Sequence, residues 1–324
     1  MKTLLLENVN PAAAQMLADF GAKVETIGSA IDEAQLLQKL ENVQILGVRS
    51  RTWLRKDLLE KAKDLKVIGA FIVGVNKIDL QAAGELGIPV FHGPFASTRS
   101  VAELAMGFVF QLFRKVGEKN LGAHSSQWLK KVDGREIRGK TLGIVGFSNI
   151  GSQLGQMAEA LGMRVIFHEV ANVLPRGLAQ RVDFDFLLEN SDAVSIHVPS
   201  LPATRNLFSR ETIGKMKKGA FLINTARGDV WNEADVCEAL QSGQLGGVAT
   251  DVFPTEPKSP QESLHSPLTE FSNAILTPHI GGSTFEAQVG IAKEVAGKVL
   301  HFLRTGDFRD AINAGFLKKE NLRT

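Results

Sequence analysis

The feature that most constrains the fold is residues 140–169, which read KTLGIVGFSNIGSQLGQMAEALGMRVIFHE. The apolar run at 142–145 predicts a short buried strand, and the apolar residues that recur at helical spacing after it predict a helix. A second apolar run at 165–167 predicts another strand. These elements form one βαβ unit, which requires a parallel sheet with helices packed against its faces.

The turn between the first strand and the helix is similar to a dinucleotide-binding fingerprint. Residues 146–151 read GFSNIG, which departs from G-x-G-x-x-G only at Ser148. The free N–H groups at the start of such a helix favour a pyrophosphate, although the Cβ of Ser148 narrows its approach. Glu169 stands where an acid accepts hydrogen bonds from a ribose diol and repels a 2′-phosphate, so the pattern predicts NAD rather than NADP. The alternative is an ordinary βαβ crossover with a solvated acid, because a degenerate glycine pattern is a weak signal.

Composition sets the limits of size, charge and compartment. A chain of 324 residues with 44% hydrophobic content is long enough for two domains, and a net charge of +2 gives no preference for nucleic acid or membranes. The only cysteine, Cys237, cannot form an internal disulfide, and its place in a predicted helix favours a core role over a reactive thiol. No apolar run reaches the roughly 18 to 20 residues of a membrane span, and the N-terminal run is too short for a signal sequence. We therefore expect a soluble, cytoplasmic protein.

Short apolar runs alternate with helical patterns along the chain, which is typical of a parallel α/β fold. An α/β segment of about 95 residues, a plausible domain by itself, precedes the break HGPFAST at 92–98. A long apolar helix follows from residue 99 to 114, so we place a domain boundary near Ser97. The final predicted helix, at 284–303, is long enough to return to the first domain.

Two segments of the first domain follow predicted strands. Arg49, Ser50 and Arg51 come directly after the strand at 45–48, and residues 72–76 follow the next strand. Ligands collect at the carboxyl ends of strands in open α/β sheets, and two arginines that flank a hydroxyl suit a small anion. The alternative is a solvated turn with surface charges.

Three ionisable residues, Arg227, Glu256 and His279, stand after strands of the second half of the chain. Oxidation of a hydroxyl by hydride loss needs a base for the hydroxyl proton, and histidine has the unperturbed pKa nearest the operating pH. A neighbouring carboxylate fixes the tautomer of an imidazole and raises its pKa, as Glu256 could do for His279. A guanidinium such as that of Arg227 can hold a substrate carboxylate by two hydrogen bonds. Each residue alone could be a loop, capping or solvated residue, but together they predict a 2-hydroxy-acid site.

Five strings in this order, GIVGFSNIG, HVPSLPATRN, LINTARGDV, DVFPTEP and LTPHIGGST, resemble the D-isomer-specific 2-hydroxyacid dehydrogenases over nearly the whole chain. Within that family, RSRT, GVNKIDL, GIPVF and STRSVAELAMG look most like the bacterial enzymes that oxidise D-3-phosphoglycerate in the first step of serine synthesis. The resemblance implies an α/β fold of two Rossmann-like, doubly wound parallel-sheet domains. An NAD-binding domain at 98–283 would be inserted into a substrate-binding (catalytic lid) domain at 1–97 and 284–324.

The resemblance also implies roles for individual residues. The catalytic set would be Arg227, Glu256 and His279, and no metal is expected. The cofactor contacts would be Gly146, Ser148, Asn149, Ile150, Gly151, Glu169, Thr225, Ala226, Arg227, Asp251, His279, Gly281 and Gly282. The substrate contacts would be Arg49, Ser50, Gly74, Val75, Asn76 and Ser97. Residues 99–128 would form the interface of a homodimer, or of part of a homotetramer.

Four positions depart from the family pattern. Ser148 replaces a glycine, Glu169 an aspartate and Ser97 an asparagine, while Trp231 is bulkier than expected. The resemblance ends near Asn313, so no regulatory ACT domain and no serine feedback through one are expected.

Two alternatives to oxidation of D-3-phosphoglycerate remain open. The first is another D-2-hydroxy acid, such as 2-hydroxyglutarate, glycerate or lactate. The second is an NAD(H)-sensing binding protein, which Ser148 favours and the intact set of Arg227, Glu256 and His279 disfavours. Turnover of a 2-hydroxy acid would separate the enzyme from the sensor.

Overall fold

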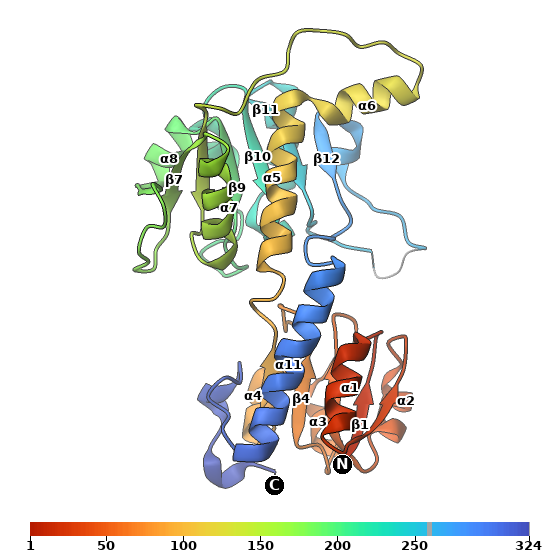
Figure 1. Cartoon of the computed structure of the whole chain (residues 1–324). Coiled ribbons are helices and arrows are strands. Elements are labelled where there is room, and N and C mark those ends of the chain that lie inside the picture. Colours follow the sequence, from red (N-terminus) through yellow and green to blue (C-terminus); the bar gives the residue numbers. More distant parts are fainter. Residues whose placement is uncertain (258–260, 324) are drawn as a thin grey trace. The chain divides into compact units, whose positions relative to one another are not determined.

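The computed structural model of the protein describes residues 1–257 and 261–323 (Figure 1). The chain folds into two compact units. The first unit contains Met1–Ser97 together with the chain from Thr284 onward, and the second unit contains Thr98–Ser283. The second unit is therefore inserted between two parts of the first. Residue 324, where the expected substrate-binding domain ends, lies outside the described residues.

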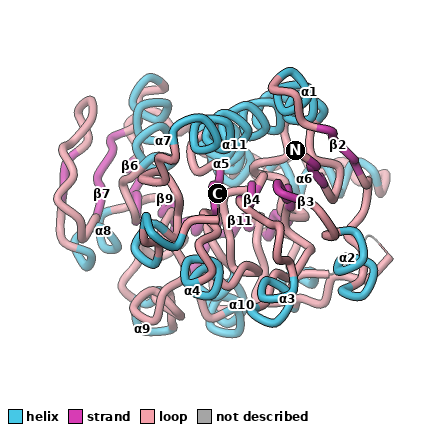
Figure 2. The backbone as a smooth tube through the Cα atoms, turned by 90° about the horizontal axis from the view of Figure 1, so that it is seen from below, coloured by secondary structure: helices cyan, strands magenta, loops and turns pink. Residues whose placement is uncertain are grey.

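The first unit is built on a five-stranded parallel sheet with the order β2-β1-β3-β4-β5. Its strands are β1 (Lys2–Leu5), β2 (Lys23–Thr26), β3 (Val43–Val48), β4 (Val67–Ala70) and β5 (Val90–His92). Its helices are α1 (Pro11–Asp19), α2 (Glu33–Lys39), α3 (Lys56–Lys61), α4 (Leu80–Glu85) and α11 (Phe285–Thr305), followed by short 3₁₀ turns at Ala314–Phe316 and Lys319–Asn321. Figure 2 shows α1 and α11 on one side of this sheet and α2 and α3 on the other.

Helix α11 brings the end of the chain back to the first unit. The side chain of Thr284 caps its start by accepting a hydrogen bond from the backbone N–H of Ala287 at 3.1 Å. Gly306 ends it in the left-handed conformation that favours glycine. Val295 and Val299 on this helix belong to the core that covers one face of the sheet. A capped helix with one continuous apolar face is thus what ties this segment to the first unit.

The second unit contains a seven-stranded parallel sheet with the order β12-β11-β10-β9-β6-β7-β8. Its strands are β6 (Thr141–Val145), β7 (Arg164–His168), β8 (Gln180–Arg181), β9 (Ala193–Ile196), β10 (Ala220–Asn224), β11 (Leu245–Thr250) and β12 (Ala274–Leu276). The chain starts at the central strand β6 and runs outward through β7 to β8, then returns to β9 beside β6 and runs outward to β12, which is the strand order of a dinucleotide-binding fold. The switch point, where such folds bind ligands, lies between β6 and β9.

Helices cover both faces of the second sheet, as the predicted fold class requires. They are α5 (Thr98–Arg114), α6 (Val116–His124), α7 (Asn149–Ala160), α8 (Phe184–Asn190), α9 (Arg210–Gly214) and α10 (Glu233–Gln241), with 3₁₀ turns at Gly228–Val230 and Pro267–Glu270. One core contains Phe108 of α5 and Leu154 of α7, and the core on the other face contains Leu187 of α8 and Val236 of α10. The prediction of two doubly wound parallel α/β units is confirmed.

Two local expectations were wrong. Helix α7 begins at Asn149 with Ser148 as its N-cap, so the turn after β6 ends earlier than Gly151. The cause is that Gly151 and Ser152 are buried in the first turn of the helix. The sequence also suggested an exposed helix around Trp128, which instead lies beyond the end of α6. None of the helices in the described part of the chain is both long and apolar enough to cross a membrane.

Candidate active site

His279 and Glu256 form a direct pair in the second unit. The Nδ1 atom of His279 lies 2.9 Å from each carboxylate oxygen of Glu256. Because a carboxylate only accepts hydrogen bonds, Nδ1 carries the proton, and in the neutral ring Nε2 is then free to accept one. The hydrogen bond that His279 donates to Glu256 raises the pKa of His279 above its usual value; burial opposes this rise, and the charges of Glu256 and Asp251 add to it. Glu256 thus holds the imidazole in one tautomer, in which Nε2 can act as a general base.

Asp251, at the end of β11, holds the loop that carries His279. Its side chain is only 2% exposed. One carboxylate oxygen accepts from Thr277 Oγ1 at 2.6 Å and from the Ile280 N–H at 2.8 Å, and the other accepts from the Gly281 N–H at 2.7 Å. These bonds hold the turn in which His279 takes the left-handed conformation, with φ +54°. Asp251 was predicted as a cofactor contact, and positioning of this loop is a role that the sequence did not indicate.

Arg227 lies on the loop after β10, and the side chain of Asn224 holds the backbone of this loop in place. Asn224 is fully buried. Its side-chain oxygen accepts from the Ala226 N–H at 3.0 Å, and its amide nitrogen donates to the Arg227 carbonyl at 2.9 Å. Although burial opposes this, the pKa of Glu256 is lowered, chiefly by its hydrogen bond to His279; the charge of Arg227 adds to that lowering and opposes the rise in the pKa of His279. The structure thus brings the three predicted catalytic residues into one electrostatic group.

The turn after β6 requires glycine at its first position and accepts serine at its second. Gly146 has φ +94°, and a Cβ on it would lie 2.6 Å from the carbonyl oxygen of His197. A Cβ on Gly151 would lie 2.2 Å from the Gly146 carbonyl oxygen. Ser148 instead is exposed, with φ −90° and ψ −134°. Its φ angle lies outside the left-handed region that favours glycine, whereas its ψ angle lies outside the main regions allowed to L-residues.

Glu169, at the end of β7, is connected to the same turn. Its carboxylate accepts hydrogen bonds from the N–H groups of Phe147 and Ala171, both at 3.0 Å. Each oxygen of a carboxylate has two lone pairs, so Glu169 retains acceptor capacity for a ribose diol. The remaining predicted contacts follow the same strands: Asn149 and Ile150 open α7, Ala226 precedes Arg227, and Gly282 follows Gly281.

Two buried polar atoms near these strand ends have no hydrogen-bond partner among the described residues. They are Oγ1 of Thr225 and Nδ1 of His197. Nε2 of His197 lies 2.9 Å from Ser195 Oγ, and burial lowers the pKa of His197 to about 3, so its ring is neutral. Unpaired buried polar atoms are unfavourable, so a ligand that supplies polar groups would satisfy them. Together with the Gly146 turn they fit a dinucleotide. Sequence reasoning missed His197, although its place at the start of HVPSLPATRN, one of the strings that carry the family resemblance, was an available signal.

The predicted substrate contacts of the first unit lie on two connected loops and a buried turn. The loops after β3 and β4 are joined where the Leu54 N–H donates to the Lys77 carbonyl at 2.9 Å. Nε of Arg49 is buried and unpartnered within the described chain, so it is available to an anion. The other positions differ in exposure: Ser50 and Asn76 are exposed, Gly74 and Val75 are half-buried, and Ser97 is buried.

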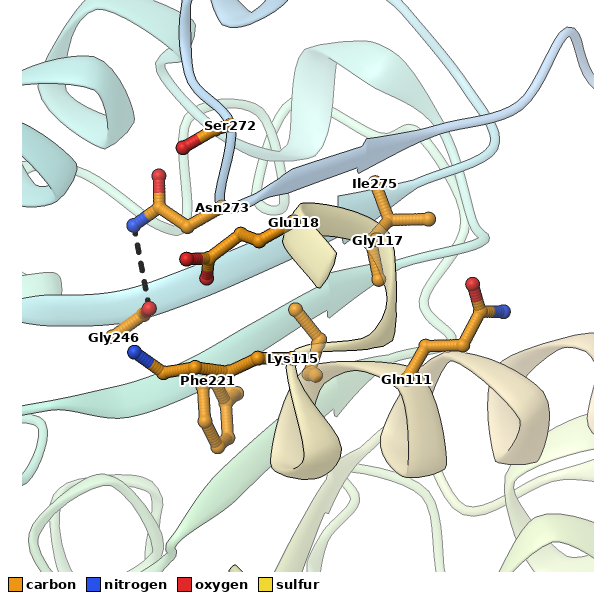
Figure 3. Close-up of a pocket in the computed structure, with 10 residues that line it drawn as sticks. Gln111, Lys115, Gly117, Glu118, Phe221, Gly246, Ser272, Asn273 and Ile275 are labelled. Carbon is orange, nitrogen blue, oxygen red and sulfur yellow. Dashed lines mark hydrogen bonds between the residues drawn. The ribbon is translucent and has the colours of Figure 1, made fainter. Parts of the chain in front are cut away.

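A shallow pocket lies at the opposite end of the second sheet (Figure 3). Phe221 and Gly246, near the starts of their strands, line it together with Lys115 and Glu118. Asn273 donates to the Gly246 carbonyl at 3.3 Å on its rim. Ligands of such folds bind at the carboxyl ends of the strands, so this pocket is not part of the candidate site. Within the described chain, no group of three or more His, Cys, Asp and Glu side chains could hold a metal ion.

Comparison with known proteins agrees with this geometry. Residues 106–281 match the model of the D-isomer specific 2-hydroxyacid dehydrogenase NAD binding domain. The chain is 46% identical to D-3-phosphoglycerate dehydrogenase of Escherichia coli, over 97% of this chain and 77% of the relative. It is 42% identical to the D-3-phosphoglycerate dehydrogenase of Dictyostelium discoideum, with the same coverage of 97% and 77%.

Solved structures show the same fold. The TT0316 protein from Thermus thermophilus superposes with a TM-score of 0.86 at 32% identity, covering 96% of this chain and all of that one. An NAD-complexed D-isomer specific 2-hydroxyacid dehydrogenase from Lactobacillus delbrueckii has a TM-score of 0.81 at 25% identity, with coverage of 96% and 100%. The predicted cofactor, NAD, is confirmed. The chain therefore belongs to the D-isomer specific 2-hydroxyacid dehydrogenases, an NAD-dependent family of oxidoreductases.

Proposed function

We propose that this protein oxidises D-3-phosphoglycerate to 3-phosphohydroxypyruvate with NAD. The observation that carries the proposal is the pairing of His279 Nδ1 with both oxygens of Glu256. It leaves Nε2 as an acceptor for the proton of a substrate hydroxyl. The relatives from E. coli and D. discoideum are both named for this activity. A place in serine biosynthesis and a cytoplasmic location belong to the same proposal.

The proposed reaction separates a hydride from a proton. NAD, when bound, supplies the acceptor for the hydride that leaves C2 of the substrate. Nε2 of His279 takes the hydroxyl proton, and Glu256 stabilises the imidazolium that forms. Arg227 holds the substrate carboxylate and polarises the neighbouring C2–O bond as it becomes a carbonyl. In the reverse direction His279 returns the proton.

We propose that the two units divide the binding of the ligands. The second unit, 98–283, would bind NAD through the Gly146 turn, Glu169 and the loop at Thr225. The first unit, 1–97 and 284–324, would bind the anionic end of the substrate through the predicted contacts Arg49, Ser50, Gly74, Val75, Asn76 and Ser97. The buried, unpartnered Nε of Arg49 supports this assignment.

We further propose that the protein is a homodimer, or part of a homotetramer, that uses residues 99–128 and the loop after them. In Figure 1, α6 extends away from the sheet of its unit and a long connection follows it. Large apolar side chains are exposed there, namely Phe110, Val116, Leu121, Trp128 and Val132. An exposed apolar surface of this kind on a folded unit is typical of a protein interface.

A substrate scan at 340 nm tests the proposed function. NADH formation is measured with D-3-phosphoglycerate and compared with lactate, glycerate and 2-hydroxyglutarate at equal concentration. The proposal predicts the highest kcat/KM for D-3-phosphoglycerate. A higher kcat/KM for another acid would show that this acid, and not D-3-phosphoglycerate, is the substrate. Tight NADH binding without turnover of any acid would identify a sensor.

A further inference from the structure

A buried glutamate stands beneath the loop proposed to bind the substrate anion. Glu7 follows β1 and is 6% exposed. Its backbone has φ +63°, and that of Asn8 has φ +54°. Residues other than glycine seldom adopt this left-handed conformation, and they keep it only where the surrounding structure enforces it. Two such residues in succession indicate that contacts within the folded unit, rather than local backbone preference, hold the chain in this bend.

The bend directs the Glu7 carboxylate into the loop after β3. One oxygen accepts a hydrogen bond from the Arg51 N–H at 2.8 Å. The other accepts from the Thr52 N–H at 2.8 Å and from Thr52 Oγ1 at 2.6 Å. Two successive backbone N–H groups that converge on one point form an anion-binding nest. In this protein the occupant of the nest is a side chain of the protein itself.

The same residue also contacts Arg49. The backbone carbonyl of Glu7 accepts a hydrogen bond from Nη1 of Arg49 at 3.3 Å. Nε of Arg49 is buried and has no partner in the described chain, so Nη1 of the guanidinium is bonded to Glu7 while the donor on Nε is left for a ligand. Because Glu7 fills the nest, an incoming anion must be bound by the side chains of Arg49, Ser50 and Arg51 instead of the backbone.

We propose that Glu7 is a positioning residue that prearranges this loop for the substrate anion. The inference rests on the proposed function, in which the loop binds the anionic end of the substrate. Glu7 itself does not touch the substrate. Its carboxylate satisfies the buried N–H of Thr52 and the part-buried N–H of Arg51, which would otherwise rearrange the loop or bind the anion in the wrong place. Its loss should therefore weaken substrate binding more than it slows the chemical step.

The test uses Glu7→Gly, with acetate as the probe that refills the nest. Glycine suits the left-handed backbone, so this variant removes the carboxylate without adding strain. Asn8→Gly is the matched control, since it relieves the same conformation at the next residue and keeps the carboxylate. We expect Glu7→Gly to raise KM for D-3-phosphoglycerate about tenfold or more with kcat within about threefold, the pattern of lost uniform binding. Acetate should lower the raised KM of this variant and should not lower that of the wild type.

Amide hydrogen exchange gives a readout that does not depend on turnover. The N–H groups of Arg51 and Thr52 should exchange faster in Glu7→Gly, and acetate should restore their protection. Asn8→Gly should retain wild-type KM and protection at both amides.

Three results would overturn the positioning role. They are unchanged exchange in Glu7→Gly, an unchanged KM despite faster exchange, or an equal rise of KM in Asn8→Gly. A wild-type protein that turns over no 2-hydroxy acid would overturn the proposed function instead. In that case, faster exchange with rescue by acetate supports the nest that Glu7 fills, and unchanged exchange rejects it.

Discussion

Nδ1 of His279 lies at the same distance, 2.9 Å, from both carboxylate oxygens of Glu256. The hydrogen bond raises the pKa of His279, so the histidine remains protonated to a higher pH than it would alone. Oxidation needs the unprotonated ring, whereas reduction of the keto acid needs the protonated one. The rate of oxidation should therefore rise with pH through this pKa, and the rate of reduction should fall through it.

Glu256→Gln should shift the pH profiles of oxidation and of reduction to lower pH, because the amide cannot stabilise the imidazolium as a carboxylate does. The measurement is kcat/KM against pH in each direction. Glu270→Gln, at an exposed acid elsewhere in the second unit, is the control and should leave both profiles in place. Profiles that coincide for wild type and Glu256→Gln would show that this pair does not set the pH dependence.

Asp251→Asn should loosen the loop that carries His279. The amide group would place N–H donors against either Gly281 N–H or Ile280 N–H, which now face carboxylate oxygens. An unsatisfied buried donor costs about 1–3 kcal/mol, so the free energy of unfolding should fall by that amount and kcat should fall with it. Asp185→Asn removes an exposed ion pair to Lys215 and should change stability by less than about 1 kcal/mol. Equal stability of the two variants in urea unfolding would contradict the role of Asp251.

Substitutions at Gly146 and Ser148, in the turn after β6, should have different effects on NADH binding. Gly146→Ala would bring a Cβ against the His197 carbonyl in a left-handed backbone, so we expect NADH binding to be lost or the unit to be destabilised. Ser148→Gly should leave the Kd for NADH within about threefold, because φ at this position requires no glycine. The Kd is measured by NADH fluorescence. A markedly weaker Ser148→Gly would show that the serine hydroxyl binds the cofactor.

Trp128→Ser should weaken self-association. The side chain is 87% exposed, and burial of an aromatic residue commonly dominates the energy of an interface. Sedimentation velocity over a concentration series should show a larger monomer fraction than for wild type. Phe285→Ser, at another exposed aromatic residue (79%), is the control and should leave the assembly unchanged. A wild type that is monomeric at all concentrations would reject the proposed interface.

The sequence allowed prediction of features that depend on local pattern. Alternation of apolar runs and helical spacing predicted the parallel α/β fold, and the turn before Asn149 with Glu169 predicted NAD. Arg227, Glu256 and His279 were identifiable because each lies on a loop that follows a predicted strand, and their catalytic roles stay predictions.

Contacts between distant loops could not be predicted in the same way. Asp251 binds backbone groups 29 and 30 residues away, and Glu7 binds Thr52 across 45 residues. No periodicity or composition in the sequence indicates which residues Asp251 and Glu7 bind. The start of α7 was also misplaced, since the burial of Gly151 within the first helical turn is a property of the packed structure.

The central claim, that His279 is the base of a D-3-phosphoglycerate dehydrogenase, is tested most directly by His279→Gln. The measurement is NADH formation from D-3-phosphoglycerate, with NADH binding measured on the same preparation and His265→Gln, an exposed histidine of the same unit, as the control. Loss of general base catalysis should lower kcat by about 10²–10⁴-fold, while the Kd for NADH stays within about threefold and His265→Gln matches wild type. Turnover of D-3-phosphoglycerate by His279→Gln at the wild-type rate would contradict the account.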